Sequence, residues 1–191
     1  MTVTRTSVPA AAGAGPAPRI LGLDLSLTST GIALPGGTTY VIPTHRRDGD
    51  RRLLTIRDEI RRILISQQPH VAVIEDLPKH AMGAGITAHV HGIVKGELLD
   101  CDVPYALVAP ATLKSYASDY GRATKERMAA AAYLAAGVSF SHDPGGDRCD
   151  AWWLRAAGLD HYGHAEVTLP AAQRARLAKV RWPELRPEAA R

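Results

Sequence analysis

The chain has 191 residues, of which 46% are apolar and 22% are charged, a composition typical of one globular domain with a full core. It contains no uninterrupted apolar stretch of about 18 residues and no apolar segment followed by a cleavage site near its start, which disfavours a membrane span or a secretory signal and predicts a cytoplasmic protein. The 23 basic and 19 acidic side chains give a net charge of +4, which is compatible with a polyanionic partner.

The first part of the chain predicts a leader followed by an antiparallel meander. Residues 1–18 are rich in Ala, Pro, Gly and Thr, a composition typical of disorder. Three short apolar runs follow, at residues 20–25, 29–34 and 38–42, and the last two flank a Pro-Gly-Gly turn. The folded domain is therefore expected to begin at residue 19 with three consecutive strands.

The rest of the chain alternates helical and strand patterns. Apolar periodicity predicts helices at 51–65, 85–100, 111–118, 124–136 and 147–159, and strands at 71–75 and 105–108. Asp147 is the expected N-cap of the last helix. Because crossover helices join parallel strands, we expect an α/β fold in which a five-stranded mixed sheet, a three-strand meander plus two parallel strands, is flanked by helices. The domain should end near residue 162, and residues 163–191 should form a basic tail that is either solvated or in contact with nucleic-acid phosphates.

Four acidic residues stand on apolar elements that should face the core. Asp24 and Glu75 end predicted strands, and Asp147 and Asp150 open the last predicted helix. Each alone could simply end a strand or cap a helix, but several buried carboxylates need a compensating cation. Oxygen ligands without His or Cys favour Mg²⁺, with Mn²⁺ as a substitute. Two such ions per active site would support hydrolysis of a phosphodiester bond.

The motifs around these acids resemble the RuvC Holliday junction resolvases, particularly the phage-type and actinobacterial members. The matching segments are ILGLDLSLTSTGIA at 20–33, VIE at 73–75 and DRCDA at 147–151. The resemblance implies a ribonuclease-H-like domain over residues 19–162 and a homodimeric endodeoxyribonuclease that nicks four-way DNA junctions symmetrically with Mg²⁺. It assigns the four acids as metal ligands and places the protein in the bacterial cytosol or in a phage-infected host.

A second pair of segments, PATLK at 110–114 and GRATKERM at 121–128, is similar to the basic segment of the same family. Lys114 and Lys125 stand at predicted helix starts, where their charges could grip a phosphate or stabilise developing negative charge. The alternative is that both lysines are merely solvated. By the resemblance, Arg122 joins them as a DNA contact.

The loop after Glu75 departs from the family. Family members commonly carry Gln and an aromatic residue that wedges into the junction, whereas this chain has DLPKHAM at 76–82. Contacts from Lys79, stacking by His80 and wedging by Met82 are therefore hypotheses.

Several smaller predictions complete the picture. Gly92 and Gly96 predict a close helix contact, either in a homodimer formed through helix 85–100 or within one chain. His89 and His91 should be partly exposed rather than metal ligands, because they are two residues apart on a helix. Other acids and thiols are expected to serve structure: Asp76 facing away from Glu75, Asp143 in a turn, and Cys101 and Cys149 as free thiols.

Two alternative functions remain open from the sequence. GLDLSLTSTG at 22–31 also resembles the first phosphate loop of actin and sugar-kinase nucleotide-binding proteins, although the chain is short for two lobes and no second Asp-x-Gly loop follows. A ribonuclease H or another nuclease of the same fold, acting on forks or RNA-DNA hybrids, is the second alternative. The leading interpretation predicts branched DNA as the partner, with no small-molecule cofactor and no membrane.

Overall fold

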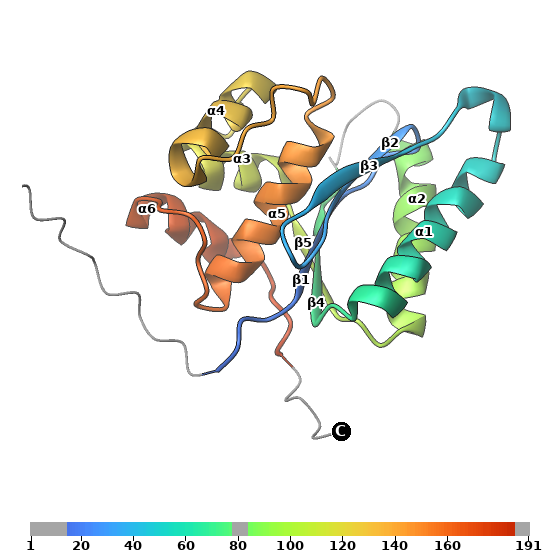
Figure 1. Cartoon of the computed structure of the whole chain (residues 1–191), viewed down its shortest axis with the longest axis horizontal. Coiled ribbons are helices and arrows are strands. Elements are labelled where there is room, and N and C mark those ends of the chain that lie inside the picture. Colours follow the sequence, from blue (N-terminus) through green and yellow to red (C-terminus); the bar gives the residue numbers. More distant parts are fainter. Residues whose placement is uncertain (1–14, 78–83, 186–191) are drawn as a thin grey trace, which may run out of the picture.

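The computed structural model describes residues 15–77 and 84–185. The hypotheses for Lys79, His80 and Met82, and most of the predicted leader, lie outside these ranges. Five strands form one mixed sheet in the order β3-β2-β1-β4-β5 (Figure 1). The meander consists of β1 (Ile20–Asp24), β2 (Ser29–Ala33) and β3 (Thr39–Pro43), and the parallel additions are β4 (Val71–Glu75) and β5 (Tyr105–Val108). The predicted fold class is confirmed.

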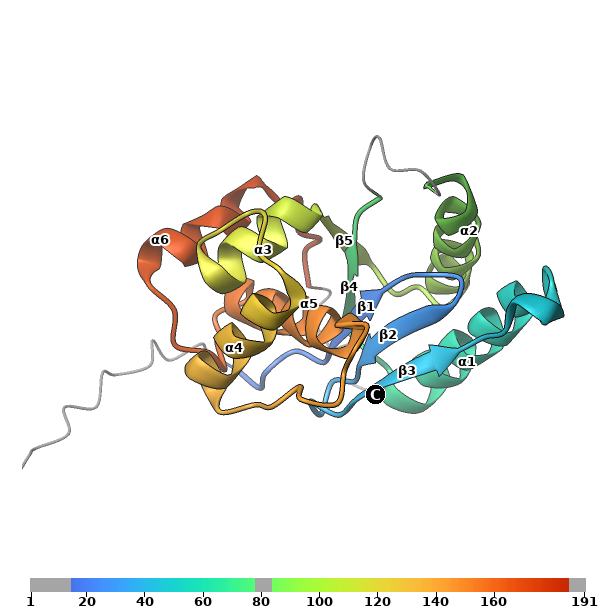
Figure 2. The same ribbon diagram turned by 90° about the horizontal axis from the view of Figure 1, so that it is seen from above.

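Helices cover both faces of the sheet (Figure 2). One face packs against α1 (Arg51–Gln67) and α2 (Ala84–Asp100), and the other packs against α3 (Pro110–Ser118), α4 (Lys125–Ala136) and α5 (Asp147–His161). The central strands are apolar on both sides for this reason. In β1, Ile20 belongs to the core under α5, whereas Leu21 and Leu23 belong to the core under α1 and α2. No helix in the described parts is both long and apolar enough to cross a membrane.

The direction of the strands fixes which loops share an edge of the sheet. β1 is parallel to β4, and β4 is parallel to β5. β3 is antiparallel to β2, which is antiparallel to β1, so β3 runs in the same direction as β1. The carboxyl ends of β1, β3, β4 and β5 therefore lie at one edge, which we call the carboxyl edge.

The start of α5 differs from the prediction that Asp147 is its N-cap. The N-cap is Gly146, which has a φ of 70° and lacks a capping side chain, and Asp147 is the first helical residue. The side chain of Asp143 supplies the missing acceptor: its Oδ2 accepts a hydrogen bond of 2.9 Å from the backbone N–H of Cys149. Asp147 is thus free to use its carboxylate elsewhere, while Asp143 caps the helix from the preceding turn.

The core extends beyond the predicted boundary at residue 162. Val167 and Leu177 are buried in the core under α5, the second of them in the turn η2 (Ala175–Lys179), which follows the short helix α6 (Ala171–Arg174). Arg174 forms an ion pair with the buried Asp160, which fixes this segment against the domain. The prediction of a tail rested on the many basic side chains of this segment, and a count of charges says nothing about the two apolar residues that anchor it.

His91 also differs from the prediction of partial exposure. His89 is exposed, but His91 is only 3% exposed, because α2 packs that side against α1 and the sheet. Burial, followed by the charge of Lys95, lowers the pKa of His91 to about 4. It is a neutral residue of the core rather than a partly solvated one.

Candidate active site

The site is built around an unusually close contact between α5 and the sheet, made possible by glycines. A Cβ atom added at Gly22 in β1 would lie 2.1 Å from the carbonyl oxygen of Ala151, and one added at Gly31 in β2 would lie 2.0 Å from that of Asp147. Real Cβ atoms do not approach other atoms so closely, so these positions accept only glycine while α5 keeps its place. The absence of two side chains therefore lets the backbone of α5 lie directly on β1 and β2.

The alternation of side chains along the strands brings the acids to the same face. Ile20 and Val73 lie in the core under α5, so Asp24 and Glu75, at even spacing from them, also face α5. β1 and β4 are neighbours in parallel register, with Leu23 opposite Ile74, which places the two carboxylates side by side at the carboxyl edge. Asp24 and Glu75 are close enough to shift each other's pKa.

The electrostatics show that Asp150 completes a compact acidic cluster. Burial, followed by repulsion from Glu75, Asp150 and Asp147, raises the pKa of Asp24 well above its usual value. Burial and the charge of Asp150 raise the pKa of Glu75 to about 7. Burial raises the pKa of Asp150 to about 6, with Asp147 adding to the effect. Carboxyl groups that hold their protons near neutral pH mark a site where negative charge is poorly compensated.

Asp147 stands at the rim of this cluster and contacts β2. Its Oδ2 accepts a hydrogen bond of 2.5 Å from the hydroxyl of Ser29, which is two residues from Gly31 on the same face of the strand. Within residues 15–77 and 84–185, no three His, Cys, Asp or Glu side chains already stand close enough together to hold an ion.

Two lysines supply the positive charge nearest to the cluster. Lys114 on α3 lowers the pKa of Glu75 and of Asp150, and Lys125 at the start of α4 lowers the pKa of all three clustered acids. Lys125 also donates a hydrogen bond to the carbonyl oxygen of Gly145, just before α5. Arg122 is exposed between α3 and α4, and no described contact joins it to the acids.

The donor set suits a hard divalent cation. Asp24, Glu75, Asp150 and Asp147 offer only carboxylate oxygens, the ligand type that Mg²⁺ and Mn²⁺ prefer. The cluster carries more negative charge than Lys114 and Lys125 compensate, which the raised pKa values show. These four residues therefore fit the predicted metal site by chemistry and by charge.

Comparisons with known proteins show similarity in sequence and in fold. No protein-family model matches the sequence. A curated crossover junction endodeoxyribonuclease RuvC from Sorangium cellulosum (strain So ce56) is 29% identical over 136 residues, covering 68% of this chain and 75% of that protein. The chain is thus similar to this RuvC in sequence. Among solved structures, T. thermophilus RuvC in complex with a Holliday junction substrate matches with a TM-score of 0.64 and 18% identity, over 79% of this chain and 99% of that one. Another Thermus thermophilus RuvC structure gives 0.63 and 18% identity, over 78% and 99%.

The RuvC-like fold confirms the resemblance predicted from the motifs and bears on the nucleotide-binding alternative. Actin-like and kinase-like proteins need two lobes with a nucleotide between them, whereas the described residues form a single sheet covered by helices. The loop after β1 also serves a different purpose. The hydroxyl of Thr30 accepts a hydrogen bond from the N–H of Ser26 and donates one to its carbonyl oxygen, which closes a tight turn before Ser29 reaches Asp147.

Several residues of the candidate site were missed by sequence reasoning. Ser29 contacts Asp147, Asp143 caps α5, and Gly22 and Gly31 admit the helix. The role of the two glycines could have been predicted, because both stand in apolar strands, where a glycine often marks the close approach of another backbone segment. No comparable signal identified Ser29 or Asp143, whose contacts depend on how α5 crosses the sheet.

Proposed function

We propose that this RuvC-like protein is an endodeoxyribonuclease that resolves four-way DNA junctions by paired symmetric nicks. The observation that carries the proposal is the cluster of Asp24, Glu75 and Asp150, rimmed by Asp147, at the carboxyl edge of a ribonuclease-H-like sheet. The names of the similar proteins, a crossover junction endodeoxyribonuclease and a RuvC bound to a Holliday junction substrate, support the choice of substrate.

The proposed mechanism assigns a task to each group. The four acids would hold two Mg²⁺ ions, with Mn²⁺ as a substitute. When bound, the ions would activate a water molecule for in-line attack on the phosphorus atom and would stabilise the leaving oxygen. Lys114 and Lys125 would hold the scissile phosphate against the acids and offset its charge. The close packing of α5 on β1 and β2 fixes Asp150 relative to Asp24, so little reorganisation is needed when substrate arrives.

The proposal is tested by comparing substrates. Purified protein would be incubated with labelled four-way junction, fork, linear duplex and RNA-DNA hybrid, with Mg²⁺ or with a chelator. We expect symmetric nicks in the junction, and no cleavage when the chelator is present. Preferential cleavage of the hybrid or the fork would support another nuclease of the same fold instead, and equal cleavage with chelator would contradict the metal assignment.

We also propose that α2 forms the interface of a homodimer. Gly92 and Gly96 are exposed, and a Cβ added at either would meet nothing within 4 Å, so neither serves a close contact within the chain. With His89 and Leu99 they follow a 3-4-3 spacing along one side of α2, the pattern of a helix-pairing seam. Leu99 is 67% exposed and would be covered by the second copy in this seam. Two copies joined here would present two acidic clusters, one for each strand to be cut.

Light scattering tests the dimer. The wild-type protein should have twice the mass of the 20.4-kDa chain, and Gly96→Arg should be monomeric because the new side chain obstructs the seam. Thr55→Arg, on the exposed side of α1, adds the same side chain elsewhere and should remain dimeric. A wild-type monomer at micromolar concentration, or a dimeric Gly96→Arg, would contradict the interface.

A further inference from the structure

A second basic surface lies at the carboxyl edge, outside the residues that the sequence motifs assigned to DNA. It is formed by residues 45–52, which connect β3 to α1 and which we call the arginine segment. This segment contains four arginines and two aspartates, and all its residues except Arg52 are exposed. Figures 1 and 2 place it at the outer end of the edge at which β1 and β4 also end.

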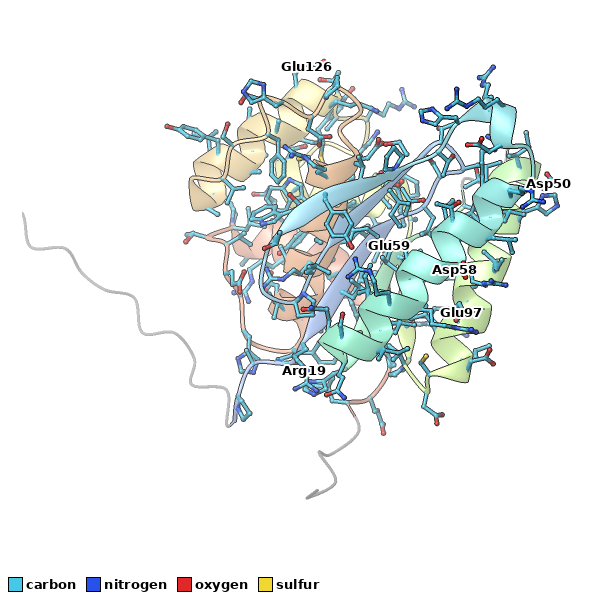
Figure 3. All side chains as sticks on the ribbon, turned by 45° about the vertical axis from the view of Figure 1, so that its right-hand side comes forward. Arg19, Asp50, Asp58, Glu59, Glu97 and Glu126 are labelled. Carbon is cyan, nitrogen blue, oxygen red and sulfur yellow. The ribbon has the colours of Figure 1, made fainter. Side chains whose placement is uncertain are left out.

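The arginines along this side of the molecule differ in their pairing. Further down α1, Arg57 is paired with Asp58, and Arg61 is paired with the buried Glu97, each at 2.7 Å. Figure 3 shows these acids along α1 and α2, below Asp50 at the upper end of α1. The arginine segment is different, since no described contact gives Arg46 or Arg51 an acidic partner.

The other two arginines of the segment keep most of their charge available as well. Arg47 approaches Asp48 only to 3.8 Å, with 83% of its side chain exposed, a geometry that contributes little. Arg52 donates to the carbonyl oxygen of Gly49, which orients its guanidinium without neutralising it. Positive charge is therefore left uncompensated at the carboxyl edge, while lower on α1 it is compensated.

The arginine segment is attached directly to the elements of the active site. Pro43, at the end of β3, is the strand partner of Ser29, whose hydroxyl bonds to Asp147. Thr44 then bonds to the loop after β1: its N–H donates to the carbonyl oxygen of Thr28 at 3.1 Å, and its hydroxyl donates to that of Leu27. The position of the segment relative to the acidic cluster is thus fixed by the sheet and by these bonds.

We propose that the arginine segment binds the backbone phosphates of a DNA duplex arm that leads away from the cleavage site. This inference rests on the proposed function. β3 is two strands from β1, about 10 Å at the usual strand spacing, and nucleotides along one strand rise about 3.4 Å each. The contacts therefore fall at least about three nucleotides from the scissile phosphate, on the helical arm rather than at the junction centre. Contacts of this kind orient the duplex without reading its sequence.

The test compares binding to junctions with long arms and with arms truncated to a few base pairs. Both are measured by fluorescence anisotropy across a salt series, with full-length protein carrying Asp24→Asn to prevent cleavage. On the long-armed junction, Arg46→Gln/Arg51→Gln should weaken binding about tenfold at low ionic strength and reduce the slope of log affinity against log salt by about 2. On the short-armed junction, the same variant should bind as its parent does.

The matched control is Arg57→Gln/Arg62→Gln, which removes the same charge from positions further along α1. Both of its arginines are paired on the protein surface, so it should leave affinity and salt slope unchanged. An equal loss from the control, or an equal loss on short and long arms, would overturn the inference. If the wild-type protein binds and cleaves junctions but the segment variant matches it throughout, only this inference is wrong, whereas a wild type that binds no junction rejects the proposed function itself.

Discussion

Asp24→Asn is expected to abolish junction cleavage while junction binding is retained. The substitution keeps the size of a partly buried side chain but removes a charge that Glu75, Asp150 and Asp147 repel. The rate of nicking should fall about 10³-fold or more, because a metal ligand contributes directly to the stabilisation of the transition state. Affinity should persist, since phosphate contacts come from basic residues rather than from the acids. Single-turnover cleavage and anisotropy on the same junction measure the two effects separately.

The same substitution should make the metal-free protein more stable. In the folded state the pKa of Glu75 is raised to about 7 and that of Asp150 to about 6, above the values near 4 of an unfolded chain. Groups with raised pKa values stabilise the fold fully only below about pH 4, and this contribution is lost as pH rises through 6 and 7. Burial and the charges of Glu75, Asp150 and Asp147 raise the pKa of Asp24 as well, so its ionisation at about pH 8 also destabilises the fold. Asp24→Asn removes this ionisation and should raise the free energy of unfolding by on the order of 2 kcal/mol there.

Divalent cations and a neighbouring acid provide the controls. Mg²⁺ should raise the Tm of the wild type more than that of Asp24→Asn, because the cation relieves repulsion that the variant lacks. Asp76→Asn changes the carboxylate that follows Glu75 in the sequence. Asp76 is near His91 of α2, on the other side of the sheet from the acidic cluster, so this variant should retain cleavage. Normal cleavage by Asp24→Asn, or a metal-free variant less stable than wild type at about pH 8, would show that the cluster is not a metal site.

The strength of the patterns explains which parts of the fold the sequence predicted. The strands of the sheet are short apolar runs separated by turn residues, and α1 has a clear amphipathic period, so their order and type follow from periodicity. The acids at the ends of β1 and β4 could be placed together because parallel neighbours end at the same edge. The packing of residues 163–179 could not be predicted, because it rests on a few buried side chains such as Val167 and Leu177.

In the site, too, some residues could be predicted from the sequence and others could not. A carboxylate in an apolar strand is conspicuous in sequence, so Asp24 and Glu75 could be selected as candidate site residues. The residues that position α5 are not conspicuous: Asp143 caps a helix from outside it, and Ser29 bonds to an acid 118 positions away. Such contacts become definite only when the crossing of α5 over β1 and β2 is known, and that crossing depends on the two glycines.

Gly31→Ala is accordingly expected to disable the protein, although it adds a single methyl group. The new Cβ would lie 2.0 Å from the carbonyl oxygen of Asp147 and 2.6 Å from its carbonyl carbon. These are backbone atoms of the first helical residue, so the contact is relieved only if the start of α5 moves away from β2 by at least about 1 Å. We expect the free energy of unfolding, measured in urea, to fall by about 3 kcal/mol or more.

The loss of cleavage by Gly31→Ala should exceed what unfolding explains. At a low temperature, where the variant is still folded by circular dichroism, a displaced α5 carries Asp147 and Asp150 away from Asp24, and a shift of this size costs about 10²-fold in rate. Gly36→Ala, in a turn where the added Cβ meets nothing within 4 Å, should change neither stability nor cleavage. A folded Gly31→Ala that cleaves at the wild-type rate would mean that the placement of α5 does not set the geometry of the acids. A folded but inactive Gly31→Ala would show that cleavage depends on the absence of a side chain at Gly31, because α5 must lie close to β2 to hold its acids near Asp24.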